Sequence, residues 1–410
     1  MGAAQDIPDR VGLPARSGGY ACHVEHRFTG PAYSLGVEEE LMIVDAETLD
    51  LANAIEGLLA DLDGRELVGE VKPELMESVC EIATTPCSNA GEIADQLGTL
   101  RATVADAAAA RGLAIGAAGT HPFAMWEDQR IVSRPRYREL VAGLQWVARQ
   151  ELIFGIHVHV GVDDPDKAMH IANGMRVHLP ILLALSANSP FWRADSTGLL
   201  SSRTPIFRAF PRVGIPPRYE DFAEWERRID FMVESRTIPD YTYLWYDVRP
   251  HPRLGTVEVR VMDSQTRLEH TVGLAALVQA MARELGEHFE SGGELSDYSF
   301  EMLDENKWYV SRHGLDGELV DLPSRERVAT RALARRLLER LRGHAEDLGS
   351  ADALAAVEDL LDNGNGGARQ RVVYEANRDF REVVAEIVEK TAPGAGARAP
   401  EQEGSIVKGP

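Results

Sequence analysis

The sequence predicts an α+β protein in which antiparallel strands come mainly before a helical last third. Polar and apolar residues alternate at period two in three separate segments, whereas apolar residues recur at helical spacing over much of the last third. The linker PHPRLG joins two extended segments and is rich in proline and glycine, which predicts an antiparallel hairpin. These observations favour a sheet and a group of helices that occupy separate parts of the chain.

The predicted strands each have one apolar and one polar face, because successive side chains of a strand point to opposite sides of the sheet. They cover Val37–Val44, Phe154–Val162, Thr256–Met262 and, as the hairpin partner of the last, Tyr241–Arg249.

The predicted helices repeat apolar residues at helical spacing. They cover Ala90–Arg111, Thr271–Glu290, Arg325–Arg342, Ala351–Leu361 and Tyr374–Lys390. The last two flank the segment NGNGG, which is expected to form a turn between helices rather than a phosphate-binding loop.

The two ends of the chain differ from its middle. Residues 1–32 have no periodic pattern and are expected to be an irregular N-terminal extension. Residues 393–410 are rich in glycine, proline, alanine and glutamate, which is typical of a disordered tail. Residues 33–392 are expected to form one domain.

Composition excludes several classes of protein. The chain has 410 residues, of which 44% are hydrophobic and 26% charged, as in a globular protein with a large core. A net charge of −22 argues against a nucleic-acid partner, because a phosphate backbone requires a basic surface. No apolar run predicts a membrane span or a secretory signal. Three cysteines without CxxC spacing predict no disulfide framework, so a cytoplasmic location is expected.

The segment GVEEE, Gly36–Glu40, is the first candidate functional motif. On a strand Glu38 and Glu40 share one face, while Val37 and Glu39 point to the other. Two carboxylates on one face repel each other unless a cation lies between them, and a divalent metal is the simplest such cation. An acidic, solvated sheet edge is the alternative interpretation.

The segment GIHVHVGV places His157 and His159 on one strand face, opposite aliphatic residues. An HxH pair on a strand is a frequent metal-binding geometry, because imidazole suits several divalent metals. Two surface histidines explain the spacing equally well, and a zinc hydrolase that uses the pair is a competing interpretation.

The segment GTVEVRVMD places Glu258 and Arg260 on one strand face. A structural ion pair would explain these two residues. In a phosphate site, the glutamate would instead hold a metal and the arginine would donate to phosphate oxygens.

The segment KPELMESVCEIAT contains Glu74, Glu77 and Glu81. Glu74 and Glu81 are seven residues apart, so they share one side of a helix but lie on opposite faces of a single strand. Two elements separated by a bend, or a solvated acidic helix face, are equally open.

Taken together, these motifs resemble the type 2 glutamate-cysteine ligases, a carboxylate-amine ligase group related to glutamine synthetase. The resemblance runs from about Tyr33 to Glu389 and is specific because the motifs recur in order. They are GVEEELMIVD, PELMESVCEIATTP, GIHVHVGV, GLLSSRTPIFRAFPRVGIPP, LWYDVRPHPRLGTVEVRVMD, ENKWYVSRHGLDGELVD and NGNGGARQ.

The resemblance implies a glutamine synthetase-like domain whose curved, mainly antiparallel sheet has helices on its outer face and the active site on its concave face. It implies three sets of site residues. The metal set is Glu38, Glu40, Glu74, Glu81, His157 and Glu258; the catalytic set is Arg260, Glu258 and His159; the set that contacts phosphate or a substrate carboxylate is Arg260, Arg203, Arg212 and Arg249.

The function implied is ATP- and Mg²⁺-dependent ligation of the glutamate γ-carboxylate to an amine such as cysteine through an acyl phosphate. The partners are then small molecules, and the sequence leaves a homodimer open. The chain has no GxxxxGK[ST] segment and no GxGxxG segment after a strand, which supports neither a P-loop nor a dinucleotide fold. A zinc-dependent hydrolase and a homologue without catalytic activity are the alternatives.

Overall fold

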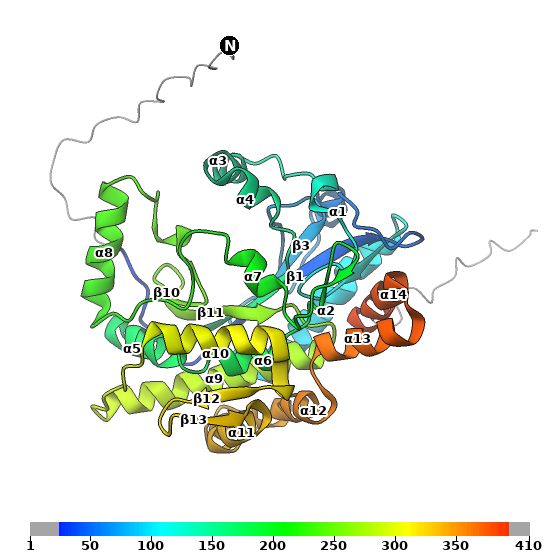
Figure 1. Cartoon of the computed structure of the whole chain (residues 1–410). Helices are drawn as coiled ribbons and strands as arrows, with labels where there is room; N and C mark the ends of the chain where they lie inside the picture. The colour runs from blue at the N-terminus through cyan, green and yellow to red at the C-terminus, as the bar shows by residue number, and fades with distance from the viewer. Residues whose placement is uncertain (1–23, 393–410) are drawn as a thin grey trace, which may run out of the picture.

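A computed structural model describes residues 24–392, which contain a central seven-stranded sheet (Figure 1). Neighbouring strands are antiparallel throughout this sheet, in the order β10-β11-β5-β1-β3-β2, and β4 pairs with the end of β1. The strands are β1 (Leu35–Asp45), β2 (Gly69–Pro73), β3 (Val79–Thr84), β4 (Leu113–Gly116), β5 (Gly155–Gly161), β10 (Val248–His251) and β11 (Thr256–Asp263).

The register of this sheet brings the sequence motifs together. Glu38 lies opposite His157 on β5, and Glu40 lies opposite Glu81 on β3. On the other edge of β5, His159 lies opposite Glu258 of β11. Segments up to 220 residues apart in the chain therefore present their polar side chains on one face of the sheet.

The other face of the sheet is covered by helices, which Figure 1 shows below the strands. The apolar residues that alternate with the acidic ones on β1, such as Val37 and Leu41, are buried there. The covering helices are α2 (Ala90–Ala109), α5 (Pro165–Met175), α6 (Leu179–Ser186) and α9 (Leu268–Glu290).

The remaining elements surround this core. The helices are α1 (Ile55–Leu62), α3 (Pro135–Leu144), α4 (Trp146–Arg149), α7 (Arg203–Phe207), α8 (Phe222–Glu234), α10 (Phe300–His313), α11 (Thr330–Asp347), α12 (Ala355–Asn363), α13 (Gly366–Asn377) and α14 (Phe380–Thr391). Short 3₁₀ turns are η1 (Trp126–Asp128), η2 (Tyr241–Tyr243), η3 (Gly314–Asp316) and η4 (Ala351–Leu354). Three small two-stranded sheets pair β6 (Phe191–Trp192) with β7 (Asp195–Ser196), β8 (Val213–Gly214) with β9 (Trp245–Tyr246), and β12 (Glu318–Asp321) with β13 (Glu326–Ala329).

This architecture confirms the expected α+β class, with an antiparallel sheet and helices packed on one of its faces. The long helices α2 and α9 are present close to their predicted bounds. α2 begins where predicted because the Asn89 side chain accepts a hydrogen bond from the Glu92 backbone, which satisfies one of the free N–H groups of the first turn.

The prediction of a helix over Arg325–Arg342 was wrong at its start. Residues 326–329 form β13, which pairs with β12 in a hairpin, and α11 begins only at Thr330. The hairpin buries Leu319 and pairs it with Val328, so cross-strand pairing overrides the helical propensity of these residues.

The predicted strand Tyr241–Arg249 was too long. The Asp240 side chain accepts from the Thr242 backbone at 2.7 Å and caps the 3₁₀ turn η2, so extended structure begins only at Trp245. The hairpin with Thr256–Met262 is nevertheless confirmed, because β10 and β11 pair in antiparallel register.

The helix predicted over Tyr374–Lys390 is interrupted. Arg378 has a φ of 56°, in the left-handed region, and α14 begins afresh after Asp379, whose side chain accepts from the Arg381 backbone. The NGNGG turn is confirmed between α12 and α13, where the Asn365 side chain caps α13 by accepting from the Ala368 backbone at 3.0 Å.

The ends of the chain complete the comparison with the predictions. Residues 24–32 contain no helix or strand, as expected. The rest of the predicted N-terminal extension, residues 1–23, and the predicted tail at 393–410 lie outside the described residues. Within residues 24–392, no helix combines the length and apolarity needed to cross a membrane.

Candidate active site

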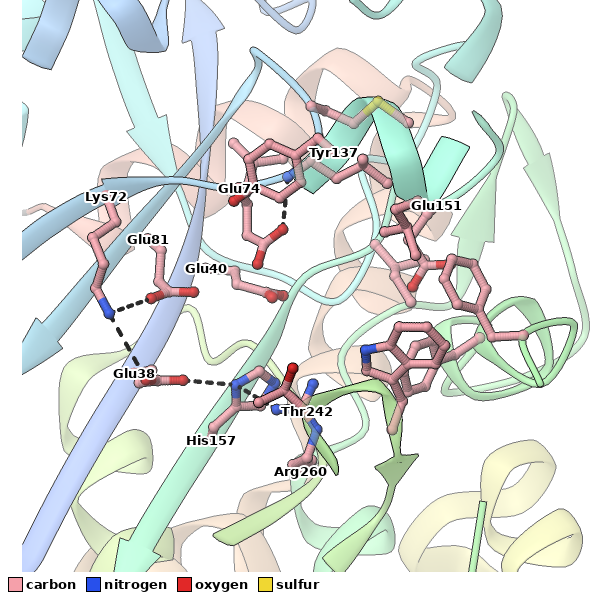
Figure 2. A pocket seen from close by; sticks show the side chains of 18 of the residues that line it. Glu38, Glu40, Lys72, Glu74, Glu81, Tyr137, Glu151, His157, Thr242 and Arg260 are labelled. Carbon is pink, nitrogen blue, oxygen red and sulfur yellow. Dashed lines mark hydrogen bonds and ion pairs between the residues drawn. The ribbon is translucent and has the colours of Figure 1, made fainter. Parts of the chain in front are cut away.

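A cavity of about 330 Å³ lies on the face of the sheet away from α2 and α9, and side chains from β1, β3, β5 and β11 form its floor (Figure 2). Helix α3 and the segment around η2 and β9 form its walls. The cavity collects most of the candidate residues from the sequence: Glu38, Glu40, Glu74, Glu81, His157, His159, Arg203, Arg249, Glu258 and Arg260.

Five of the six acidic residues that line the cavity belong to two separate groups. Ligand atoms of Glu38, His159 and Glu258 lie within 4.8 Å of one another, which defines the first ligand group. The second ligand group consists of Glu40, Glu74 and Glu81, by the same criterion. Carboxylates and imidazole are the ligands that divalent cations take in proteins.

The second ligand group is an arrangement of carboxyl groups that repel one another. Burial raises the pKa of Glu81 to about 8, and the carboxylates of Glu38 and Glu74 add to the rise. Burial likewise raises the pKa values of Glu40 and Glu74 to about 7, with a neighbouring carboxylate adding to each. The Lys72 ammonium lies 3.0 Å from Glu81, yet the three pKa values stay raised, so a divalent cation would add the positive charge that these carboxyl groups need.

Glu74 reaches this group because a bend separates β2 from β3. β2 ends at Pro73, Glu74 follows, and Glu81 lies on β3, so the interpretation of two elements separated by a bend is confirmed. Glu77, which lies within the bend, accepts from Arg130 at 2.7 Å and is not part of the cavity wall.

The two histidines of the HxH pair have different surroundings, and only His159 belongs to the first ligand group. The Nδ1 atom of His157 lies 3.0 Å from Glu38 and 3.3 Å from Arg260. His159 contacts Thr256 through Nδ1, and its buried Nε2 has no hydrogen-bond partner although it lies 3.8 Å from Glu38 and 3.9 Å from Glu258. An unpartnered nitrogen between two carboxylates fits a cation ligand.

The electrostatics of the first ligand group differ from those of the second. Burial and the Arg260 guanidinium together lower the pKa of His157 to about 4, so this ring is neutral at pH 7. Burial acts to raise the pKa of Glu38, yet the hydrogen bond from His157 and the proximity of His159 hold it well below its ordinary value. Glu38 is therefore a carboxylate at neutral pH.

Glu258 and Arg260 contact each other, as an ion pair would, and both line the cavity. Arg249 donates through Nε to Glu258 at 2.6 Å and through Nη1 to the backbone oxygen of Thr242 at 3.1 Å. These hydrogen bonds hold the Arg249 side chain in place at the cavity wall. The buried Nε of Arg260 has no partner, which leaves donor capacity for an anion in the cavity.

Glu39 points to the opposite face, as the strand alternation predicts, but it is completely buried rather than solvated. Arg101 of α2 donates to both of its carboxylate oxygens at 2.8 Å, and Thr271 of α9 donates to one of them. The sequence analysis missed Arg101, because no local pattern links residues 62 positions apart.

Lys72 of β2 is a second residue that the sequence analysis missed. Its Nζ atom lies 3.0 Å from Glu81 and 3.9 Å from Glu38, so it is a cation at the edge of both ligand groups. The signal for it is the antiparallel register of β2 and β3, which places Lys72 opposite Glu81.

The candidate arginines Arg203 and Arg212 lie in different places. Arg203 lines the cavity, whereas Arg212 does not. Arg212 donates to the backbone oxygen of Tyr243 and lies over the ring of Trp245, 5.3 Å from its centroid, so it supports the cavity wall from behind.

The far wall of the cavity was not predicted at all. Figure 2 shows Glu151 and Tyr137 on the other side of Glu40 from Lys72. Tyr137 belongs to α3, which also contributes Arg136, and both lack any motif that marks them in the sequence.

The donor set fits divalent cations that prefer oxygen ligands better than a histidine-rich zinc site. Five carboxylates supply the two ligand groups, and only one histidine belongs to either of them. Among the described residues, no ligand group contains both His157 and His159, so the geometry does not favour the hydrolase alternative.

Known proteins are similar to this chain over nearly its whole length. The family described as Glutamate-cysteine ligase family 2 matches residues 34–390. A protein of Rubrobacter xylanophilus, provisionally named glutamate–cysteine ligase 2-1, is 45% identical over 370 residues that cover 90% of this chain and 98% of the relative. A protein of Sorangium cellulosum, provisionally named glutamate–cysteine ligase 2, is 43% identical over 363 residues that cover 88% of this chain and 97% of the relative.

Solved structures share the fold at low sequence identity. The glutamate–cysteine ligase of Francisella tularensis in complex with AMP has a TM-score of 0.65 and 14% identity, and the match covers 91% of each chain. A bifunctional glutathione synthetase of Pasteurella multocida has a TM-score of 0.62 and 15% identity, and the match covers 88% of this chain and 51% of that one.

Proposed function

Because the chain belongs to glutamate-cysteine ligase family 2, we propose that it joins the γ-carboxylate of glutamate to an amine such as cysteine, with ATP as the energy source. The family supports the coarser class of ATP-dependent carboxylate-amine ligase. The two substrates and the acyl-phosphate route are the parts that we propose.

One observation of the cavity supports this proposal most directly. Two ligand groups dominated by carboxylates lie side by side on one sheet face, next to Arg260, whose Nε atom has no partner. Carboxylates clustered in this way suit the phosphates of ATP only when cations lie between the two sets of negative charge. Two cation sites beside a guanidinium suit phosphoryl transfer, which demands positioning and charge neutralisation more than covalent chemistry.

The proposed reaction has two steps. A carboxylate is a poor acyl donor at neutral pH because oxide would have to leave. The γ-carboxylate therefore attacks the terminal phosphate of ATP, which gives an acyl phosphate and ADP. The amine then attacks the acyl carbon and expels inorganic phosphate.

Residues of the chain have distinct tasks in this proposal. Glu38, His159 and Glu258 would hold one Mg²⁺, and Glu40, Glu74 and Glu81 another. Bound Mg²⁺ supplies positive charge against the phosphate oxygens. Arg260 donates to the phosphoryl group in transfer, because it lines the cavity and its Nε atom has no partner. His157, neutral and bonded to Glu38, orients that carboxylate.

The test is release of phosphate from ATP by the purified protein with Mg²⁺, glutamate and a panel of amines that includes cysteine. We expect release that requires both glutamate and an amine. Absence of amine-dependent release with every member of the panel would reject the ligase and favour a homologue without catalytic activity. Activity that persists without ATP and is lost on zinc removal would instead indicate the hydrolase.

A further inference from the structure

Glu151 is an acidic residue of the cavity that belongs to neither ligand group. It follows the short helix α4 and lies on the far wall in Figure 2. Its Oε2 atom is buried without a hydrogen-bond partner, and within residues 24–392 its carboxyl group takes part in no ion pair. A buried acid without a partner is unfavourable, so a ligand that brings a cation would satisfy it.

Arg203 is the complementary group, and it lines the same cavity. Its side chain is buried, yet its Nε has no partner, and its two other nitrogens make only long hydrogen bonds of 3.3 and 3.4 Å to the backbone oxygens of Arg260 and Val261. A guanidinium can donate five hydrogen bonds, so Arg203 retains capacity for a carboxylate.

Glu151 and Arg203 influence each other without forming a contact. Burial raises the pKa of Glu151 well above its ordinary value, and among charged groups Arg203 opposes that rise most strongly. No ion pair within 4.0 Å joins the two side chains, both of which are described. A buried acid without a partner and a guanidinium with unused donors therefore line one cavity without contacting each other.

We propose that Glu151 and Arg203 are the two poles of a binding site for the α-amino and α-carboxylate groups of the amino acid whose side chain is activated. The α-ammonium and α-carboxylate groups of an amino acid are bonded to one carbon, so a single ligand in the cavity presents a cation and an anion together. Glu151 binds the α-ammonium group, and Arg203 binds the α-carboxylate. This inference rests on the proposed function and names the chemical class of its donor substrate.

The non-reacting ammonium group suits Glu151 better than the ammonium group of the acceptor does. A carboxylate beside an ammonium group stabilises its charged form. That is favourable for the α-ammonium of the donor, which stays protonated throughout the reaction. It would hinder the acceptor, which must lose its proton before its nitrogen can attack.

Gly155 lies close to Arg203, which supports a fixed position of this guanidinium at the cavity. A side chain at residue 155 would meet the guanidinium, with a Cβ only 2.8 Å from its Cζ atom. The glycine at the start of β5 thus leaves room for Arg203 to lie flat against the strand, and the backbone N–H of the same glycine donates to Glu40. Both features place Arg203 beside the second ligand group.

The decisive experiment compares glutamate with glutarate, which keeps both carboxylates and lacks the amino group. For the wild-type protein we expect kcat/KM for glutamate to exceed that for glutarate by about 100-fold, the range for a buried charged pair. Glu151→Gln should lower kcat/KM for glutamate by about the same factor and change that for glutarate by less than about threefold. Equal losses with both substrates, or retained preference for glutamate, would overturn the role of Glu151.

A second pair of substrates tests Arg203. The compound 4-aminobutyrate keeps the amino group and the carboxylate to be activated but lacks the α-carboxylate. Arg203→Lys removes the forked donor while it keeps the charge, so we expect about a tenfold loss of preference for glutamate over 4-aminobutyrate. An unchanged preference would overturn the role of Arg203.

Two controls separate this inference from the proposed function. Glu139→Gln changes an exposed acid on α3 outside the cavity wall and should leave the preference for glutamate unchanged. Calorimetric titration with glutamate or glutarate in the absence of ATP measures binding at this site even if no turnover occurs. Tighter binding of glutamate that Glu151→Gln abolishes supports the inference independently of ligase activity, and equal binding of the two compounds overturns it.

Discussion

The two faces of β1 use the same residue type for opposite purposes. On the helix-covered face, Glu39 is completely buried and receives hydrogen bonds from Arg101 and Thr271. On the cavity face, Glu38 and Glu40 lie among other carboxylates, and burial raises the pKa of Glu40 to about 7. Within one triplet, Glu39 is thus fully compensated by partners in the chain, whereas the compensation of Glu40 is incomplete.

This difference indicates how charged residues that stabilise the fold are distinguished from those that bind a ligand. A buried acid whose partners are supplied by the chain contributes to the folded state, and removal of one partner leaves an uncompensated charge. A group of buried acids whose counter-charge is incomplete is retained at a cost in stability, which is typical of sites that bind a cation or substrate. Four predictions test this separation.

The largest expected effect is that of Glu40→Gln on the cavity face. The amide keeps the shape of the side chain and removes a charge from the second ligand group, so we expect phosphate release to fall by about 1000-fold, or roughly 4 kcal/mol. The thermal midpoint should not fall, because repulsion is relieved. The control is Glu47→Gln, an exposed residue just after β1, which should retain near-wild-type activity. Equal effects of the two substitutions would refute the role of Glu40.

On the helix-covered face, Arg101→Met should chiefly cost stability. It leaves Glu39 buried without its cation, so we expect the free energy of unfolding in urea to fall by about 3 kcal/mol. The double variant Glu39→Met with Arg101→Met should be more stable than this single variant, because no charge remains unpaired. Arg65→Met, at an exposed position, is the control. A loss of less than about 1 kcal/mol for Arg101→Met would show that the pair is not structural.

The stability of the metal-free protein should depend on pH through the carboxyl groups on the cavity face. The pKa values of Glu40, Glu74 and Glu81 rise from 4.5 to about 7, 7 and 8 on folding. Carboxyl groups with raised pKa values bind more protons in the folded than in the unfolded state. Their contribution to stability is therefore present below pH 4.5 and is lost as the pH rises toward 8. In EDTA we expect the thermal midpoint at pH 8 to lie roughly 5 °C below that at pH 6.

Thermal midpoints measured with and without Mg²⁺ test whether the same carboxyl groups bind a cation. A divalent cation should raise the thermal midpoint more at pH 8 than at pH 5.5, because protons compete with it for the same carboxylates at the lower pH. A midpoint that does not depend on Mg²⁺ at pH 8 would contradict cation binding by these groups.

The smallest effect is expected for Arg212→Met. Arg212 lies behind Trp245 and does not line the cavity, so its loss should lower kcat/KM by about threefold at most, roughly 0.7 kcal/mol. A loss comparable to that of Glu40→Gln would mean that Arg212 reaches the substrate after all.

Sequence patterns predicted the faces of the strands but not the partners across them. Alternation alone placed Glu38 and Glu40 on one side and Glu39 on the other, since a strand has a fixed period of two. It could not identify His159 as the histidine that joins Glu38 and Glu258, because that depends on the register of β1, β5 and β11. Register follows from packing of the whole sheet.

The residues that were missed lack any local signal. Arg101 lies within an ordinary helix, and Glu151 follows a helix of four residues. Both acquire their roles only from segments distant in the chain. The errors at Arg325–Arg342 and Tyr241–Arg249 have a similar origin, since hairpin pairing and a capping aspartate overrode the local pattern.

The hydrogen bonds of Arg101 also carry a consequence for how the chain matures on the ribosome. Besides Glu39, its guanidinium donates to the backbone oxygens of Gln265, Thr266 and Thr391, and the last of these is synthesised 290 residues after Arg101. At ordinary rates of translation that interval is roughly 15–60 s. A nascent chain therefore holds Glu39 and Arg101 without their final surroundings until α14 emerges, so catalytic competence should appear late and abruptly, and chains released before Thr391 should be substrates for proteolysis.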